Sequence, residues 1–299
     1  MPYIGEAAAL ATAVLWTLSS LAWTSAGRFV GAVQVSFIRL MITCVFLVVY
    51  GQLVRGLPLP TDAPADVWLI LGLSGFVGFF VTDLCLFKAY LLIGPRLSLL
   101  ILSLSPPVAS LLSATVLGDW LSAKDWAAMA VTLVGVAWVV FERPDTSRRL
   151  HYVQPQQYRF GIVLAVLASL GHAAALVLSK RGIGTYDPFA ATFIRIIGSL
   201  VGYMPLMTIL GRWPGTIRAL GHGRSMLILT FGAFVGPFLG VAMYMIAVRH
   251  AQAGIVATII ATMPVLILPF VIFLYREKVS IRAAAGALLS VIGVALLML

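Results

Sequence analysis

The feature that most constrains this chain is its long stretches without a charged residue. No Asp, Glu, Lys or Arg occurs from Leu97 to Leu117 or from Ala253 to Tyr275. An α-helix needs about 20 residues to cross the hydrocarbon core of a bilayer, and each stretch supplies them. The whole sequence is 61% hydrophobic and 10% charged, whereas a soluble domain carries about 25% charged residues. These patterns predict an integral membrane protein.

Ten apolar segments follow one another in two sets of five. The first set is Ile4–Thr24, Val33–Val54, Val67–Phe87, Leu97–Leu117 and Trp126–Phe141. The second set is Phe160–Leu178, Phe189–Leu210, Met226–Val248, Ile255–Tyr275 and Ala283–Leu299. Between the sets lies a polar stretch with prolines and adjacent charges, which is typical of an interdomain linker. We therefore expect an all-α polytopic fold with one unit at 1–142, a connecting loop at 143–159 and a second unit at 160–299.

The two sets resemble each other in a common register. A shift of 158 residues places Phe76-Val77-Gly78 on Phe234-Val235-Gly236 and Pro106 on Pro264, and a shift of 156 places Arg39 on Arg195. Such self-similarity indicates a duplicated unit. Because each unit has an odd number of spans, the second copy must cross the membrane in the opposite direction. The sequence predicts two inverted five-helix repeats around a central cavity, the arrangement that secondary transporters use for alternating access.

Pro106 and Pro264 fall near the middle of the fourth and ninth segments. A proline removes a helical hydrogen bond and kinks the chain, so we expect paired kinks that help to open the cavity and to gate it. The alternative is that both prolines reflect only the higher frequency of proline in membrane helices.

Four side chains are candidates for contact with a substrate. Trp16 and His172 occupy corresponding places in the first and sixth segments, close to the expected midplane. Either one can instead be a packing residue, and His172 can hydrogen-bond to a neighbouring helix. Tyr244 is a weaker candidate, since aromatic rings are common at membrane boundaries.

Asp83 is the fourth candidate, and it lies well inside the third segment. Placing a carboxylate there costs about 2.5 to 3.5 kcal/mol, so it needs a partner, protonation or water. Lys88 is five residues away on the same helix and faces another direction. Asp83 could couple transport to protons or make a structural hydrogen bond. Arg39 and Arg195 are expected near helix ends, where their long side chains reach the interface; alternatively, they line a pathway and attract anionic groups.

Small residues recur at intervals of four in the third and eighth segments. They include Gly78 in one segment and Gly232, Gly236 and Gly240 in the other. Such ridges allow two helix backbones to approach closely, so we interpret them as packing faces.

Several chemistries have no signature in the sequence. There is no phosphate-binding loop for ATP, no zinc-protease motif and no nucleophile elbow, and the four histidines are scattered. The net charge of +10 comes from basic residues dispersed between apolar segments, so no continuous basic face for nucleic acid is expected. We expect no enzyme activity, no cofactor and no metal site. The expected partners are a small-molecule substrate and membrane lipid, with no nucleic acid, and we expect the chain to be a monomer.

The same motifs resemble the EamA branch of the drug/metabolite transporter superfamily over essentially the whole chain. The resemblance rests on Trp16, Arg39, Pro106, Gly118-Asp119 and Gly135-Val136, with counterparts at Arg195, Pro264, Glu277 and Gly293-Val294. It implies a multi-pass transporter of the bacterial inner membrane that exports amino acids or other small metabolites. A membrane-embedded lipid-modifying enzyme, in which Asp83 and His172 would form the acid–base pair, and a non-transporting partner subunit are the alternatives.

The orientation in the membrane stays open. Fourteen basic residues flank the loops that follow the odd-numbered segments, and six lie on the other side. The excess of basic residues in cytoplasmic loops places the first group inside and both termini outside. The family resemblance instead implies cytoplasmic termini.

Overall fold

The structure is a computed structural model that describes residues 3–30, 32–142, 155–275 and 280–298. All regular secondary structure in these residues is helical. Nine of the helices described there are long and apolar enough to cross a membrane, and a shorter apolar helix covers Ile281–Leu297. The predicted all-α fold with ten membrane helices is confirmed.

Each unit contains the helices of five spans, and the label η marks a π-helical segment. The first unit has α1 (Ile4–Val30), α2 (Ala32–Tyr50), η1 (Gly51–Arg55), α3 (Ala65–Gly75), η2 (Phe76–Val81), α4 (Thr82–Leu102), α5 (Ser105–Leu117) and α6 (Ala123–Glu142). The second unit has α7 (Pro155–Ile183), α8 (Pro188–Ile209), α9 (Trp213–Leu220), α10 (Gly223–Ala233), η4 (Phe234–Gly240), α11 (Val241–His250), α12 (Ala253–Ile260), α13 (Met263–Tyr275) and α14 (Ile281–Met298).

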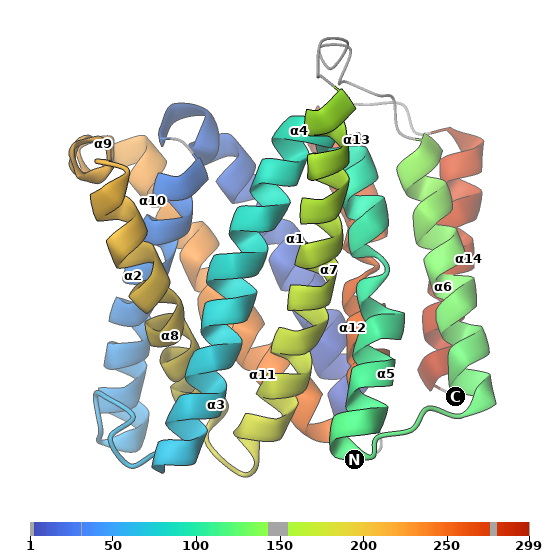
Figure 1. The fold of residues 1–299 in the computed structure, drawn as a ribbon, viewed down its shortest axis with the longest axis horizontal. Coiled ribbons are helices and arrows are strands. Elements are labelled where there is room, and N and C mark those ends of the chain that lie inside the picture. Colours follow the sequence, from blue (N-terminus) through green and yellow to red (C-terminus); the bar gives the residue numbers. More distant parts are fainter. Residues whose placement is uncertain (1–2, 31, 143–154, 276–279, 299) are drawn as a thin grey trace.

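The helices stand side by side, and corresponding helices of the two units run in opposite directions (Figure 1). Helix α1 rises from the lower end of the view, whereas α7 descends from the upper end. We call these two ends the lower face and the upper face. Both chain termini lie at the lower face, which also carries the turn between α7 and α8. The short helix α9 lies at the upper face, and its amphipathic sequence was not predicted as a separate element.

The two units are packed into each other rather than placed next to each other. Helix α1 of the first unit packs on α10, η4 and α11 of the second, α4 packs on α7, and α6 packs on α14. One apolar core therefore contains residues of both units, among them Leu71, Ala109, Leu176 and Ile259. Any movement of one unit against the other must shear this shared core.

The sixth span begins earlier than predicted. Helix α7 starts at Pro155, whereas the apolar pattern begins at Phe160. Proline fits the first helical position because its missing N–H would have no partner there. The polar residues that follow it are exposed, so the first turns of α7 extend the helix beyond its apolar part.

The duplication extends to the irregular features of the helices. The third span of each unit contains a π-helical segment that begins on the same Phe-Val-Gly sequence, at Phe76 in η2 and at Phe234 in η4. The fourth span of each unit is interrupted immediately before its proline. Helix α5 begins one residue before Pro106, and α13 begins one residue before Pro264. Each proline thus lies in the first turn of a half-helix, where it costs no hydrogen bond.

Glycine allows the closest contact between the units. A Cβ atom at Gly198 of α8 would overlap the carbonyl group of Gly72 in α3, and one at Gly75 would overlap the backbone of Arg195. By contrast, a Cβ atom at Gly72 would meet no atom within 4 Å. Helices α3 and α8 therefore cross in backbone contact, which requires glycine at Gly198 but not at Gly72.

This crossing gives a matched pair of substitutions. Gly198→Ala should lower the midpoint of thermal unfolding in detergent by several degrees, because overpacking costs about 1–3 kcal/mol and each kcal/mol shifts the midpoint of a large domain by about 2–4 °C. Gly72→Ala should leave the midpoint unchanged or raise it slightly, since alanine favours a helix. Equal midpoints for the two variants would contradict the backbone contact.

Candidate functional site

An aromatic stack joins the two units near the middle of the bundle. The Trp16 indole of α1 stacks on the Tyr244 ring of α11, with 5.8 Å between the ring centroids. The guanidinium of Arg195, on α8, lies over the same Tyr244 ring at 4.9 Å and over the Phe79 ring of η2 at 4.8 Å. His172 of α7 interacts electrostatically with Arg195. We call these five residues, Trp16, Phe79, His172, Arg195 and Tyr244, the central cluster.

The residues of the central cluster differ in solvent exposure. Arg195 and Tyr244 are each 3% exposed, whereas Trp16, Phe79 and His172 keep intermediate exposure. Three of the predicted contact residues, Trp16, His172 and Tyr244, thus meet around one arginine that the sequence analysis had placed at the interface. The partly exposed rings are the surfaces that a small molecule could reach.

The glycine ridge of the second unit holds the aromatic residues of α1. A Cβ atom at Gly240 would lie 2.7 Å from Cδ1 of Trp16, and one at Gly232 would lie 2.7 Å from Nε1 of Trp23. At Gly236 the nearest atoms would be those of Ser19, at 2.8 Å. Each added side chain would push α1 outwards, so the ridge sets the position of Trp16.

Gly78 has the same role on the other side of the central cluster. A Cβ atom there would lie 2.9 Å from the Cβ of Ala175 and 3.6 Å from Nη2 of Arg195. The absence of a side chain at Gly78 therefore allows α7 to approach at Ala175, whereas the contact with Arg195 would be an ordinary one.

A second charged cluster contains Arg39, Asp83 and Trp23. Arg39 Nη2 of α2 donates to the Asp83 carboxylate of α4 at 2.5 Å, and its guanidinium lies 4.3 Å from the Trp23 ring centroid. Arg39 supplies the partner that Asp83 was predicted to need. We call this group the Arg39 cluster.

The expectation that Arg39 and Arg195 extend to the membrane interface was wrong. They are 7% and 3% exposed, respectively. The predicted segment start at Val33 was nearly right, because α2 begins at Ala32, but Arg39 lies two turns into the helix and is buried there. Arg195 likewise lies two turns into α8, which begins at Pro188.

Asp83 and His172 do not form the acid–base pair that an enzyme would need. Within the described part of the chain, Asp83 forms its ion pair with Arg39, and no hydrogen bond joins it to His172. Among the same residues, no group of three or more His, Cys, Asp and Glu side chains could hold a metal ion.

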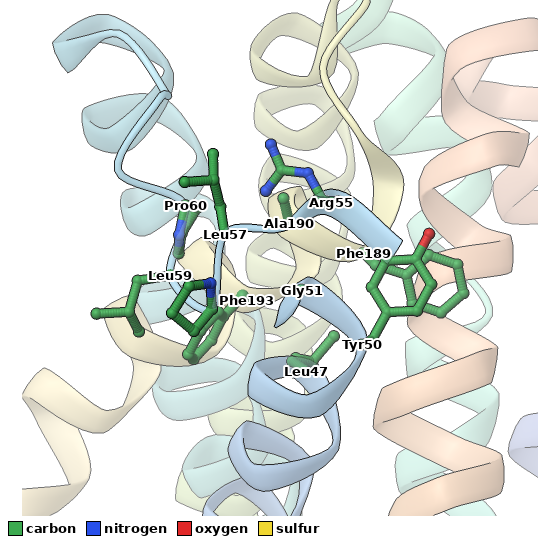
Figure 2. Close-up of a pocket in the computed structure, with 11 residues that line it drawn as sticks. Leu47, Tyr50, Gly51, Arg55, Leu57, Leu59, Pro60, Phe189, Ala190 and Phe193 are labelled. Atoms are coloured by element: carbon green, nitrogen blue, oxygen red, sulfur yellow. The ribbon is translucent and has the colours of Figure 1, made fainter. Parts of the chain in front are cut away.

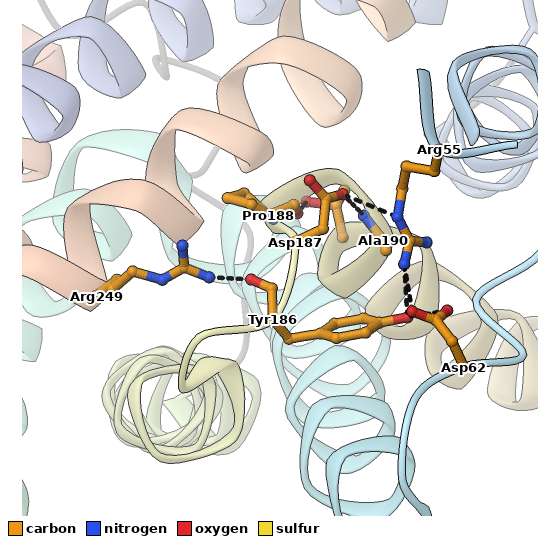
Figure 3. Close-up of polar contacts among 8 residues, drawn as sticks. Arg55, Asp62, Tyr186, Asp187, Pro188, Ala190 and Arg249 are labelled. Atoms are coloured by element: carbon orange, nitrogen blue, oxygen red, sulfur yellow. Dashed lines mark hydrogen bonds and ion pairs between the residues drawn. The ribbon is translucent and has the colours of Figure 1, made fainter. Parts of the chain in front are cut away.

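Ionic contacts tie the two units together at the lower face (Figure 3). Arg55, at the end of η1, donates to the Asp62 carboxylate at 2.5 Å and lies 4.0 Å from Asp187 of the second unit. The Tyr186 hydroxyl, in the turn between α7 and α8, donates to Asp62 at 2.9 Å. Arg249 donates to the Tyr186 carbonyl group.

Asp119 and Lys180 make a second connection at the lower face. Lys180 Nζ of α7 donates to the Asp119 carboxylate and to the Ala251 carbonyl group, each at 2.7 Å. Asp119 also accepts hydrogen bonds from the Ala253 backbone N–H at 3.1 Å and from the Ser113 hydroxyl at 2.9 Å. We call the contacts of Arg55, Asp62, Asp119, Lys180, Tyr186 and Asp187 the lower ionic network.

The environment of this network shifts the pKa of its members. Partial burial alone would raise the pKa of Asp119, but the hydrogen bonds from Lys180, Ala253 and Ser113 outweigh burial and hold it below its ordinary value. The pKa of Asp62 is lowered in the same way, with Tyr186 and Arg55 outweighing burial. Burial and the bond to Asp62 raise the pKa of Tyr186 to about 12. Both carboxylates are therefore charged, and Tyr186 is neutral, at neutral pH.

Sequence reasoning missed this network because its residues lie in loops and at helix ends and come together from distant parts of the chain. Asp119 was noticed as the counterpart of Glu277, and this repeated acidic position after the fourth span was the available signal. Nothing in the sequence pairs it with Lys180, which is 61 residues away.

A pocket at the lower face lies outside the central cluster (Figure 2). The end of α2, the loop that follows it and the start of α8 line the pocket, with Tyr50, Arg55 and Phe189 at its rim. Its cavity volume is about 10 Å³, about the space that one water molecule needs. Because ligand pockets usually enclose about 300–1,000 Å³, we do not assign the substrate to this pocket.

The Arg39 cluster can be tested by a double-mutant cycle. Arg39→Met and Asp83→Asn should each destabilise the protein by about 3 kcal/mol, because each leaves a buried charge without its partner. The combined variant should lose less than the sum of the two, since neither charge remains. Thermal unfolding in detergent measures all four proteins, and additive losses would show that the ion pair is not the stabilising contact.

Comparisons with known proteins agree with this architecture. The EamA-like transporter family matches this chain twice, over residues 3–141 and 159–299. An uncharacterized transporter of Archaeoglobus fulgidus is 22% identical over 288 residues, which cover 95% of this chain and 94% of that protein. One solved crystal structure superimposes with a TM-score of 0.78 at 19% identity, over 99% of this chain and 96% of the other; this likeness shows the fold alone.

Proposed function

We propose that this chain, which belongs to the EamA-like transporter family over both of its halves, is a secondary transporter that moves a small metabolite by alternating access. Membership of the family makes it a multi-pass membrane transporter. The mechanism and the substrate are the parts that we propose here. Export of amino acids by a monomer in a bacterial inner membrane, with lipid around it, is the form of this proposal that the sequence favours.

The observation that carries the proposal is the position of the central cluster behind a closed face. The Trp16–Tyr244 stack joins α1 of one unit to α11 of the other, while the lower ionic network connects the same two units nearer the lower face. In transporters with inverted repeats, rocking of one repeat against the other exposes a midplane site to each side in turn. The present arrangement supports a state that is closed at the lower face.

The irregular helices supply places where the units can bend. The π-helical segments η2 and η4 each interrupt a third span, and the fourth spans break before Pro106 and Pro264. Such irregular backbone is tolerated at membrane depth where protein or water covers it. We propose that these paired positions change shape during transport and that a cavity between the units opens around the central cluster.

The central cluster can be tested by transport in proteoliposomes. Trp16→Ala and His172→Ala should each reduce the flux of a labelled amino acid mixture at least about tenfold, because truncation removes a contact surface between substrate and both units. Trp120→Ala is the matched control, since that ring is 70% exposed and should leave the flux unchanged.

Folded protein must be quantified for each variant by size-exclusion chromatography. If folded Trp16→Ala and His172→Ala variants carry the same flux as the original chain, neither residue contacts the substrate. If no member of the mixture is moved by any variant or by the original chain, amino acids are not the substrates.

The lower ionic network predicts a gate that depends on Asp119. Asp119→Asn removes the charge that holds Lys180, so the lower face should open more often. The measurement is the labelling rate of a cysteine at Ser179, a fully buried position next to Lys180, in a background where Cys44 and Cys85 are replaced. Labelling should accelerate several-fold in Asp119→Asn.

Asp125→Asn is the matched control for this gate, because Asp125, in the first turn of α6, bonds only to the neighbouring Ser122 among the described residues.

The direction of the pH effect on the Asp119–Lys180 ion pair follows from the lowered pKa of Asp119. The ion pair is present above the ordinary carboxyl pKa and is lost as pH falls through the lowered value. Between pH 5 and 8 the ion pair should therefore stay intact. Equal labelling in Asp119→Asn and Asp125→Asn would refute this gate.

A further inference from the structure

Arg195 is a buried charge that has no counterion among the described residues. It is 3% exposed, and no described carboxylate lies within ion-pair distance of it. Its neighbours are the rings of Phe79 and Tyr244, the Tyr244 hydroxyl, and the Met245 sulfur at 3.4 Å from Nη1. The Nε atom is buried and has no hydrogen-bond partner in the part of the chain that the structure describes.

The duplicated unit provides an internal comparison. Arg39 occupies the equivalent position in the first unit, where Asp83 neutralises it at 2.5 Å. The residue equivalent to Asp83 in the second unit is Val241, in the register that also relates Phe76 to Phe234. Tyr244 and Met245 follow Val241 by three and four residues on α11, so all three lie on the helix face towards Arg195. The second unit thus keeps the arginine but replaces its carboxylate with an apolar side chain.

Aromatic rings alone do not compensate for this charge. A cation–π contact contributes about 0.5–2 kcal/mol, whereas a charge held at the centre of a membrane protein without a counterion costs more than that on most scales. No described carboxylate compensates for the charge, so an anionic ligand from outside the chain is suited to do so. Guanidinium and carboxylate groups match in shape and form paired hydrogen bonds, so a carboxylate is the suitable ligand.

We propose that Arg195 binds the carboxylate group of the transported substrate. This inference rests on the proposed transport function and adds the chemical class of its substrate. The neighbouring Trp16–Tyr244 stack offers an apolar surface for the rest of the molecule, and the His172 imidazole and Tyr244 hydroxyl offer hydrogen-bonding groups beside the carboxylate. The substrate class is a small carboxylate with an apolar or aromatic portion.

The test introduces a carboxylate beside Arg195 by mutation. Val241→Asp restores in the second unit the pair that the first unit has, so its carboxylate should compete with the substrate for Arg195. Val241→Asn has the same shape without the charge and is the control. Arg195→Gln removes the charge, and Arg195→Lys keeps it without the planar pair of donors.

The probes are amino acids and simple monocarboxylates, each compared with its carboxamide, and sodium chloride alone as the inorganic anion. Thermal unfolding reports binding, because a ligand of the folded state raises its stability. Proteoliposome flux reports transport. Carboxylates should stabilise the original chain and Val241→Asn and should be transported by both. In Arg195→Gln and in folded Val241→Asp, carboxylate flux should fall by about 30-fold or more, with partial recovery in Arg195→Lys.

The outcomes separate this inference from the transport proposal. Equal flux of carboxylates and carboxamides, unchanged in Arg195→Gln, would overturn the role of Arg195 and leave transport standing. Stabilisation that depends on Arg195 and on chloride alone would assign the site to an inorganic anion and would also overturn the substrate claim. If Val241→Asp does not fold, the comparison of Arg195→Gln with Arg195→Lys decides the question by the same flux measurement.

Discussion

Lipid offers no hydrogen bonds to the backbone, and the rest of this structure follows from that constraint. A helix satisfies its own N–H and C=O groups, so the spans are helical wherever the chain faces hydrocarbon. Four exceptions lie inside the spans, namely η2, η4 and the breaks before Pro106 and Pro264, while η1 forms the end of the second span. All four belong to spans that pack against the opposite unit. The inverted duplication allows irregular backbone within the membrane, because each unit covers the irregular segments of the other and shields their backbone groups from lipid.

The sequence predicted the helical fold and the two-unit organisation because both depend on patterns that are local or periodic. The length of the uncharged stretches matches the thickness of the bilayer. Duplication is indicated by a common register, which pairs Phe76 with Phe234 and Pro106 with Pro264. The same register predicted paired kinks at Pro106 and Pro264, but it did not predict the π-helical segments η2 and η4. Helix ends were less predictable, since polar residues after Pro155 continue a helix that hydropathy alone would end.

The candidate site was predicted less completely, for a physical reason. Trp16 and His172 were chosen for their depth in the membrane, and Tyr244 was a weaker candidate; the three lie close to one arginine. That arginine was misplaced, because hydropathy treats a charge near the end of an apolar segment as an interfacial group. Partners such as Arg39 for Asp83 and Lys180 for Asp119 depend on how distant helices pack. No pattern along a single chain contains that information.

The two units differ at residues of the central cluster and the Arg39 cluster. Trp16 corresponds to His172, and Asp83 corresponds to Val241, so one unit neutralises its arginine and the other does not. The lower ionic network also uses residues of both units at one face, which makes the two ends of the pathway unequal. Fully exposed ion pairs contribute about 0–1 kcal/mol each. The pairs of the lower ionic network are partly buried, so in the proposed cycle breaking them is part of the free-energy cost of opening this face. A ligand can shift that equilibrium only by its difference in affinity for the two states. An anion that pairs with Arg195 in one state and is released in the other would supply that difference.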